Sequence, residues 1–209
     1  MRIIAGTKRR MKLLGPKTDT SRPITDRVKE ALFSVLYKYN LPEGKIVADL
    51  FSGVGSMGLE ALSRKAKSAT FVEKDPKIIP ILKKNIEKAG FVKESRVIRA
   101  DAFKIGAPPD FEGQKYDLVF VDPPYRLTTN VQHGSPLSGL LDLLAGQLKP
   151  GGIVVVRTEK KTELLARYNR LEIIQRRKWA NMAVTILSLG THDLSDKPRD
   201  TSDDFKDDQ

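Results

Sequence analysis

A short apolar segment, a glycine-rich turn and a helical segment follow one another between residues 45 and 65. Ile46 to Phe51 is apolar except for Asp49, as expected for a strand buried in a parallel sheet. The turn from Gly53 to Gly58 contains three glycines and opens a helix predicted over about 57–65. Glycines let the backbone bend sharply and approach a ligand closely. This succession predicts a ligand-binding strand–turn–helix unit and restricts the chain to folds that contain one.

Strands and helices alternate along the rest of the central chain. Further strands are predicted over 69–73, 96–100, 116–121 and 153–157, and helices over 75–90 and about 137–148. Asp75 and Pro76 are typical of an N-cap and a first helical position. Pro80 is expected to bend or delay the first turns of that helix, and Gly90 to end it.

Two antiparallel strands are predicted near the end, over about 171–177 and 182–189. The sequence therefore predicts the α/β class, with a mostly parallel seven-stranded sheet whose last strand is antiparallel. Ligands of such sheets bind at the carboxyl ends of the strands. The expected organisation is a basic arm over 1–22, one catalytic or binding domain over 23–190, and an acidic, disordered tail over 191–209.

The basic arm precedes the first predicted helix. Arg2 to Ile4 and Met11 to Leu14 are expected to form a short hairpin around Gly6 and Thr7. The helix is predicted from Thr25 to about Tyr39, because apolar residues recur there at helical spacing.

Charge indicates the class of partner. The net charge is +11, but the last 19 residues carry seven Asp against three Lys or Arg, so residues 1–190 hold 34 basic and 19 acidic side chains. Such an excess favours a polyanion as partner, because basic side chains that neutralise phosphates release counterions. Backbone contacts to RNA are predicted for the basic residues Arg2, Lys8, Arg9, Arg10, Lys12, Arg22 and Arg27.

Composition also argues against several classes. There is no cysteine, and the two histidines, His133 and His192, share no metal-ligand spacing, so no metal is expected. No apolar run reaches about 20 residues and no signal peptide is evident, so we expect a cytoplasmic protein without a membrane partner or an obligate protein partner.

Acidic residues end or nearly end three consecutive predicted strands at the ligand edge. The glycine pattern matches the dinucleotide fingerprint, and Glu73 lies 20 residues past Gly53, where a ribose-binding acid belongs. This fits a nicotinamide or flavin enzyme as well as a methyltransferase. However, a buried Asp49 needs a polar or cationic partner. S-adenosylmethionine offers one, whereas a pyrophosphate would be repelled. Asp101, just past the third strand, can accept a hydrogen bond from an adenine amino group.

The most specific motif is Asp122-Pro123-Pro124-Tyr125, directly after the strand 116–121. An exocyclic amine on a base is a poor nucleophile, because its lone pair is delocalised into the ring. A carboxylate at Asp122 and a main-chain carbonyl held by the prolines can accept hydrogen bonds from the N–H groups of the amine. These hydrogen bonds make the nitrogen lone pair available for attack on the methyl group. Tyr125 supplies a flat face on which the base can stack.

Together these motifs resemble class I methyltransferases that act on planar nitrogens. The chain further resembles the RsmD family of 16S rRNA guanine-N2 methyltransferases over about residues 1–190. The segments that carry this second resemblance are Met1 to Gly6, Arg22 to Phe33, Gly58 to Arg64 and Phe71 to Asp75. Lys65, Val54 and Met57 depart from residues common in the family, and the segment from Leu127 to Ser138 has no counterpart there.

The resemblance implies a Rossmann-like fold, S-adenosylmethionine as cofactor and 16S rRNA, within a small-subunit particle, as substrate. It implies that Asp122, Pro123, Pro124 and Tyr125 act on the base and that the basic arm grips RNA. The residues expected to bind the cofactor are Asp49, Phe51, Gly53, Gly55, Gly58, Glu73, Asp101 and Ala102.

Three alternatives remain open from the sequence. The first is methylation of another planar nitrogen, either adenine N6 in DNA or RNA or a glutamine amide in a protein. The second is a dinucleotide-dependent oxidoreductase, and the third is an RNA-binding module without catalysis. The nucleotide position, the form of the RNA and the oligomeric state are not determined by the sequence.

Overall fold

A single mixed sheet organises the chain in the computed structural model, which describes residues 1–16, 24–109, 112–179 and 181–190. The sheet has eight strands in the order β3-β2-β1-β4-β5-β8-β7-β6. Their bounds are β1 Ile46–Leu50, β2 Ser68–Glu73, β3 Ser95–Arg99, β4 Tyr116–Val121, β5 Leu148–Glu159, β6 Arg167–Tyr168, β7 Leu171–Trp179 and β8 Met182–Leu189. Strands β1 to β5 pair in parallel, and β8, β7 and β6 add antiparallel pairs.

The predicted fold class is confirmed, with one strand more than expected. The additional strand, β6, is a two-residue segment that pairs with the start of β7. Two residues are too short to show the alternation of apolar and polar side chains that identifies a strand in sequence.

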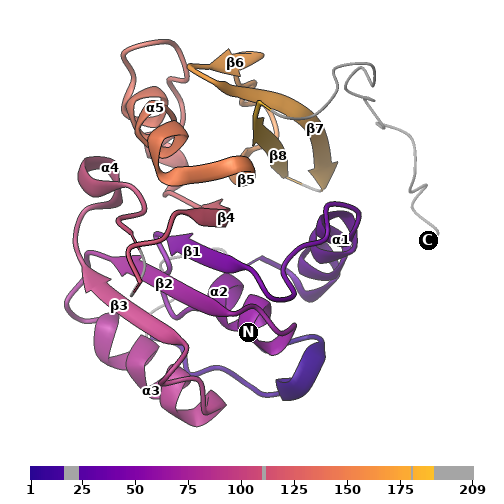
Figure 1. Cartoon of the computed structure of the whole chain (residues 1–209), viewed down its shortest axis with the longest axis vertical. Helices are drawn as coiled ribbons and strands as arrows, with labels where there is room; N and C mark the ends of the chain where they lie inside the picture. Colours follow the sequence, from indigo (N-terminus) through magenta and orange to yellow (C-terminus); the bar gives the residue numbers. More distant parts are fainter. Residues whose placement is uncertain (17–23, 110–111, 180, 191–209) are drawn as a thin grey trace.

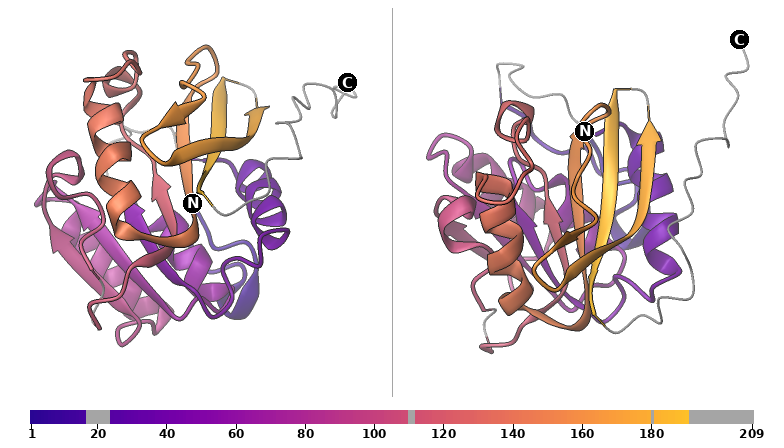
Figure 2. Two further views of the ribbon diagram at one scale, coloured as in Figure 1. Left: turned by 45° about the horizontal axis from the view of Figure 1, so that its top comes forward. Right: turned by 90° about the horizontal axis from the view of Figure 1, so that it is seen from above.

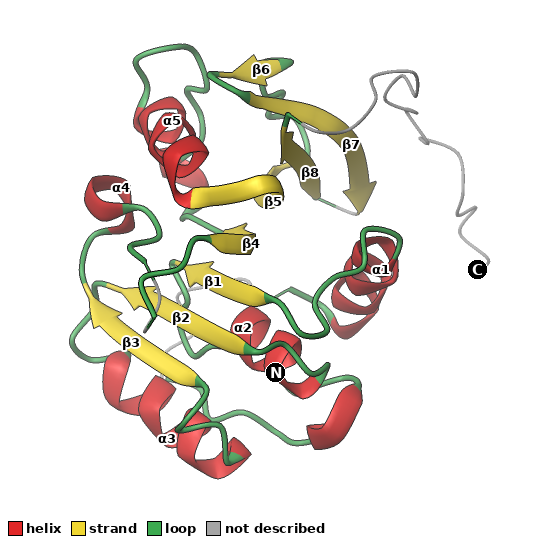
Figure 3. Ribbon diagram, viewed as in Figure 1, coloured by secondary structure: helices red, strands yellow, loops and turns green. Residues whose placement is uncertain are grey.

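Two 3-10 helices and five α-helices occur among the described residues (Figure 3). Their bounds are η1 Gly6–Lys8, α1 Asp26–Tyr37, α2 Ser56–Ser63, α3 Ile79–Ala89, α4 Ala102–Ile105, η2 Tyr125–Leu127 and α5 Pro136–Gln147. None of these described helices combines the length and the apolar character that crossing a membrane requires.

The predicted start of α3 at Asp75 and Pro76 is wrong. The helix begins four residues later, at Ile79, and Pro80 lies in its first turn, where a missing N–H costs nothing. The side chain of Asp75 instead accepts a hydrogen bond from the N–H of Lys77 at 2.8 Å, which closes a local turn before the helix. Gly90 ends the helix in the left-handed conformation, as predicted.

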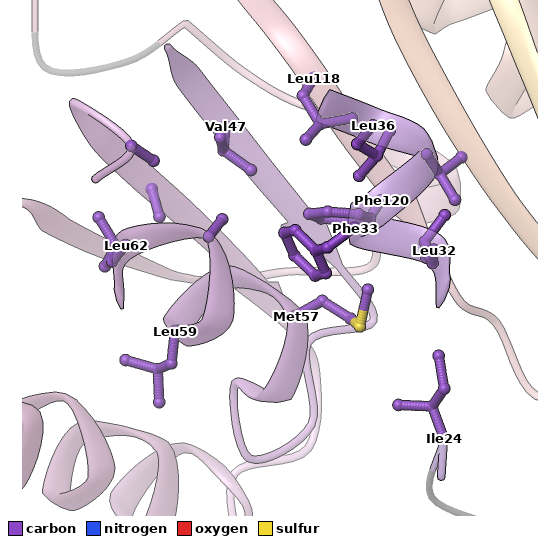
Figure 4. Packing of buried hydrophobic residues seen from close by; sticks show 14 of the residues in the cluster. Ile24, Leu32, Phe33, Leu36, Val47, Met57, Leu59, Leu62, Leu118 and Phe120 are labelled. Atoms are coloured by element: carbon purple, nitrogen blue, oxygen red, sulfur yellow. The ribbon is translucent and has the colours of Figure 1, made fainter. Parts of the chain in front are cut away.

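Helices cover both faces of the sheet (Figure 2). The arm, α1, α2 and α3 pack on one face, and α4 and α5 pack on the other. Side chains along β1 alternate accordingly, since Val47 belongs to the first core while Ile46 and Ala48 belong to the second. In the first core, Phe33 of α1 lies beside Phe120 of β4, with ring centroids 5.8 Å apart (Figure 4).

The arm is part of this core. Arg2 and Lys12 form an antiparallel bridge, as a hairpin predicts, but the turn between them is η1. Ile3 is fully buried and Leu13 is 9% exposed, and both pack in the first core. Arg22 and the acidic tail lie outside the described residues.

Strand order places a crevice at the carboxyl end of β1. The chain passes from β1 to β2 on one side, and β4 lies on the other side. Such a reversal of strand order leaves room for a ligand between the two loops that leave the sheet there. Asp49 lies near the end of β1, Glu73 is the last residue of β2, and Asp122 follows β4.

Candidate active site at the carboxyl edge of the sheet

Asp49 fixes the glycine-rich turn to the sheet. Its side chain is 2% exposed, and its Oδ2 accepts a hydrogen bond from the N–H of Gly58 at 2.8 Å. Burial raises the pKa of Asp49 to about 8, and the carboxylates of Asp122 and Glu73 contribute to this rise. A cation that enters the crevice would stabilise the ionised form of this carboxyl group and lower its pKa.

The three glycines of the turn have different physical roles. A Cβ at Gly58 would lie 2.3 Å from the ring of Phe71, and a Cβ at Gly55 would lie 2.6 Å from Leu82. These two glycines are therefore required by packing and by the positive φ of Gly55. At Gly53, where φ is +53°, a Cβ would meet no other side chain or backbone within 4 Å. Only this glycine of the three faces open space and contributes to the cavity wall.

Phe51 stands at the end of β1 with a φ of +59°, a conformation that bulky residues rarely adopt. Its ring packs against Phe103, with centroids 4.9 Å apart. Backbone strain of this kind costs about 1–3 kcal/mol and is concentrated at ligand sites. Its position in the cavity wall agrees with the predicted role in cofactor binding.

Glu73 supports the loop on the other side of the crevice. Its Oε2 accepts from the N–H of Gly53 at 2.8 Å, and its Oε1 accepts from the N–H of Asp75 at 2.9 Å. Because each carboxylate oxygen has a second acceptor site, Glu73 can still receive hydroxyl groups from a ligand. It also lines the cavity.

Asp101 lies just past β3, as predicted, and its side chain caps α4. Its Oδ1 accepts from the N–H of Phe103 at 3.1 Å and caps α4, and its Oδ2 lies 3.8 Å from the Nζ of Lys74. Its neighbours Ala100 and Ala102 line the cavity, whereas Asp101 does not. An adenine contact by Asp101 stays a prediction.

The Asp-Pro-Pro-Tyr motif leaves β4 at the same edge. Asp122 follows Val121, and its Oδ1 accepts from the Nε of Arg157 at 2.6 Å. Burial raises the pKa of Asp122, and the guanidinium of Arg157 opposes this rise. The same guanidinium lies 5.9 Å from the ring centroid of Tyr125, within the range of a cation–π contact.

Sequence analysis missed Arg157. The available signal was its position as the last residue of the predicted strand 153–157, where a charged side chain reaches the ligand edge. Parallel pairing of β4 and β5 aligns Val121 with Val156, which brings the next residues, Asp122 and Arg157, side by side.

These side chains surround one cavity of about 630 Å³, a volume typical of ligand sites. The predicted site residues in its wall are Asp49, Phe51, Gly53, Glu73, Ala102, Asp122, Pro123, Pro124 and Tyr125. Wall residues that were not predicted include Met1, Pro16, Ile24, Ser56, Met57, Lys74, Arg126 and Arg157. The acids of β1 and β2 and the motif after β4 therefore open into a common space. Among the described residues, no group of three His, Asp or Glu side chains is arranged to hold a metal ion.

The family described as Conserved hypothetical protein 95 matches residues 1–188, nearly the whole domain and arm. The ribosomal RNA small subunit methyltransferase D of Haemophilus influenzae is 36% identical over 172 residues, covering 81% of this chain and 84% of the relative.

The chain belongs to this RsmD-like rRNA methyltransferase family.

Solved structures agree on the fold. The Escherichia coli protein yhhF matches with a TM-score of 0.74 and 29% identity, covering 90% of this chain and 97% of the other. An RNA methyltransferase from Salinibacter ruber, solved with S-adenosyl-L-homocysteine, matches with a TM-score of 0.60 and 18% identity, over 84% and 98% of the two chains.

Three of the four segments that carry the RsmD resemblance meet in a buried ion cluster. Glu60 of α2 is fully buried and accepts from the N–H groups of Ile4 at 2.8 Å and Ala5 at 3.1 Å. It also pairs with the Nζ of Lys29 at 3.2 Å and the Nε of Arg64 at 2.8 Å. The cluster joins the arm, α1 and α2, so these three segments stabilise the fold together. No local sequence pattern indicates this cluster, because Glu60 lies far along the chain from Lys29 and from the arm.

The turn of the basic arm around Gly6 lies away from the cavity, although Met1 and Pro16 at the two ends of its described part line the cavity. Gly6 packs against Ser63 at the end of α2, whereas Ser56, at the start of α2, lines the cavity. Eight helical residues separate these ends by about 12 Å. Of the predicted RNA contacts, Arg9, Arg10, Lys12 and Arg27 are exposed, Lys8 is half-buried, and Arg2 pairs with Asp26 at 2.6 Å.

Proposed function

We propose that this chain transfers a methyl group from S-adenosylmethionine to the exocyclic N2 of a guanine in 16S rRNA. The observation that carries the proposal is that the buried carboxyl of Asp49 and the Asp122 motif open into one cavity. One half of this space suits a cationic cofactor, and the other half suits a planar amine.

The cofactor half favours S-adenosylmethionine over a dinucleotide. Glu73 places a carboxylate beside Gly53, and Asp49 ionises when a cation enters the crevice, so a cation is favoured there and a pyrophosphate is not. S-adenosylmethionine supplies an electrophilic methyl group on a positively charged sulfonium. Asp49 would face the cationic part, Glu73 the ribose hydroxyls, and Phe51 and Ala102 the apolar wall.

The acceptor half provides what an exocyclic amine needs. Asp122 accepts a hydrogen bond from an N–H group of the amine. This hydrogen bond releases the nitrogen lone pair from the ring and directs it toward the methyl group. Tyr125 stacks on the base, a contact worth about 1–3 kcal/mol in comparable sites. Pro123 and Pro124 hold the intervening main chain.

The RsmD resemblance favours guanine over adenine, and the name of the relative and the charge favour small-subunit rRNA as the substrate. The relative from Haemophilus influenzae is named for small-subunit ribosomal RNA, and residues 1–190 carry a large basic excess. Incubation with small-subunit particles and mass mapping of the nucleosides tests the assignment. We expect N2-methylguanine, and methyladenine would overturn the choice of base while leaving the methyltransferase reaction in place.

Replacing Glu73 with alanine should weaken cofactor binding by about 1–3 kcal/mol, the value of hydrogen bonds to a charged group. Calorimetric titration with S-adenosylhomocysteine measures the loss. Glu73→Gln is the matched control, because it keeps an acceptor for the loop and lacks the charge. If the alanine variant binds with wild-type affinity, the ribose role is wrong.

Cofactor affinity should rise with pH up to about 8 and then level off. The raised pKa leaves Asp49 mainly protonated at lower pH in the ligand-free protein, and only the ionised form pairs with a cation. The slope approaches tenfold per pH unit below the pKa. Ionisation of the ligand itself affects binding to wild type and to Asp49→Asn alike. The difference between the pH profiles of the two proteins therefore reports the ionisation of Asp49. Equal pH profiles would contradict the role.

Exposed cations of the arm should contribute to RNA affinity. The double replacement Arg9→Ala and Lys12→Ala should weaken binding and flatten its dependence on salt, by about 0.7–0.9 in the log–log slope per lost phosphate contact. The control is the double replacement Lys104→Ala and Lys115→Ala, which removes the same charge. Lys104 lies on the opposite face of the sheet from the arm. Equal salt slopes for both pairs would place the RNA surface elsewhere. Deletion of the whole arm is unsuitable as a test, because it removes Ile3 from the core.

A further inference from the structure

We propose that Arg157 is a positioning residue of the acceptor site, which holds the side chains of Asp122 and Tyr125 in the arrangement that receives the base. This inference rests on the proposed function and adds a residue that neither the motif nor the family assignment identifies.

The sheet itself places Arg157 at this point. Asp49, Asp122 and Arg157 continue the alternating side of the strands to which Val47, Phe120 and Val155 belong, so all three point to the face covered by α1 and α2. Arg157 lies in the middle of the sheet, between β4 and β8, where its backbone pairs with Val184. Val156, the residue before it, pairs with Val121 of β4. The sheet therefore holds the main chain at this point, and the side chain of Arg157 can adjust to the cavity.

Arg157 contacts both the first residue of the motif, Asp122, and its last residue, Tyr125. Its Nε donates to Asp122 Oδ1 at 2.6 Å, and its guanidinium lies 5.9 Å from the Tyr125 ring. The side chain of Arg157 is 14% exposed and that of Asp122 is 24% exposed, so water screens this pair less than a surface pair. One cation thus sets the direction of the acceptor oxygen and lies against the ring on which the base stacks.

The charge of Arg157 also favours the ionised state of Asp122. The charged and titratable groups around Asp122 are Arg157 from β5, Asp49 from β1, and Tyr125 and Arg126 from η2. Asp49 repels Asp122 only in its ionised form, and Arg157 is the cation in contact with the carboxylate of Asp122. Loss of Arg157 should therefore raise the pKa of Asp122 and rotate its carboxylate away from the amine.

A double-mutant cycle tests whether Arg157 acts through Asp122. Arg157→Met should lower kcat for methylation of small-subunit particles about tenfold or more at neutral pH, with little change in the KM for the cofactor. In the Asp122→Asn background, the same replacement should lower kcat less than about threefold, because the ion pair is already absent. Equal effects in both backgrounds would overturn the proposal.

The acidic limb of the kcat profile gives a readout that a merely structural role would not change. It should move to higher pH in Arg157→Met and return toward wild type in Arg157→Lys, which restores the charge. Arg167→Met is the matched control, since it removes an arginine from an exposed ion pair with Glu172 on β7. Thermal melts confirm folding, and Arg157→Gln replaces the methionine variant if that variant does not fold.

Carbon-detected NMR titration of the Asp122 carboxyl, without RNA or cofactor, separates this inference from the proposed function. We expect a higher pKa for Asp122 in Arg157→Met than in wild type. An unchanged pKa together with an unchanged kcat profile would refute the positioning role. The identity of the methylated nucleoside in the wild-type reaction reports on the proposed function independently.

Discussion

Replacing Asp122 with alanine is expected to lower kcat by about two orders of magnitude or more, while cofactor affinity stays near that of the wild type. The hydrogen bond from the amine to Asp122 strengthens as the nitrogen attacks, so its loss affects the transition state more than the bound ground state. Single-turnover methylation of small-subunit particles measures the rate, and titration with S-adenosylhomocysteine measures affinity.

Two further variants make the Asp122 result interpretable. Asp122→Asn keeps an acceptor oxygen and should retain more activity than the alanine variant. Tyr125→Ala should weaken capture of the base and raise the KM for RNA. Because alanine at position 122 leaves the cation of Arg157 without this carboxylate, a thermal melt must accompany the kinetics. A folded Asp122→Ala protein with wild-type turnover would exclude the assigned role.

Replacing Glu60 with alanine should cause the largest loss of stability, about 3–5 kcal/mol, as expected when one partner of a buried ion pair is removed. The change leaves two cationic side chains, Lys29 at 1% and Arg64 at 4% exposure, without their shared carboxylate. It also removes the acceptor of the N–H groups of Ile4 and Ala5. Denaturant titration measures the loss, and hydrogen exchange at Ile4 and Ala5 should accelerate together.

Glu43→Ala is the matched control for Glu60. Glu43 pairs with Lys65 at 3.1 Å, but both side chains are about two-thirds exposed, so this replacement should change the free energy of unfolding by less than about 0.5 kcal/mol. Similar losses for the two variants would show that the Glu60 cluster does not hold the arm to the domain.

The structure changes the interpretation of two predicted cofactor-binding residues. Asp49 and Glu73 each hold part of the glycine-rich turn by a hydrogen bond to a backbone N–H, besides facing the cavity. Their replacement therefore alters the turn as well as the ligand contact, which is why amide variants are the informative controls at both positions.

The sequence by itself determined the elements and their order. The apolar segment before Gly53, the alternation that follows and the position of Asp122 after a strand are local patterns, and parallel strands align their carboxyl ends whatever the loops contain. The arrangement of Asp49, Glu73 and Asp122 around one edge was predictable for this reason. Helix boundaries were less predictable where a turn competes with the first helical residues. At α3, Asp75 closes such a turn, and the helix begins only at Ile79.

Only the tertiary structure decided which residues share a contact. Gly58 is required by the ring of Phe71, and Asp101 caps α4. Arg157 reaches Asp122 because β4 and β5 pair in register, across 35 positions of sequence. Glu60 binds the arm from more than 50 residues away. Local patterns fix the hydrogen bonding and periodicity of each element, but a buried ion pair depends on strand register and helix packing, which no single segment encodes.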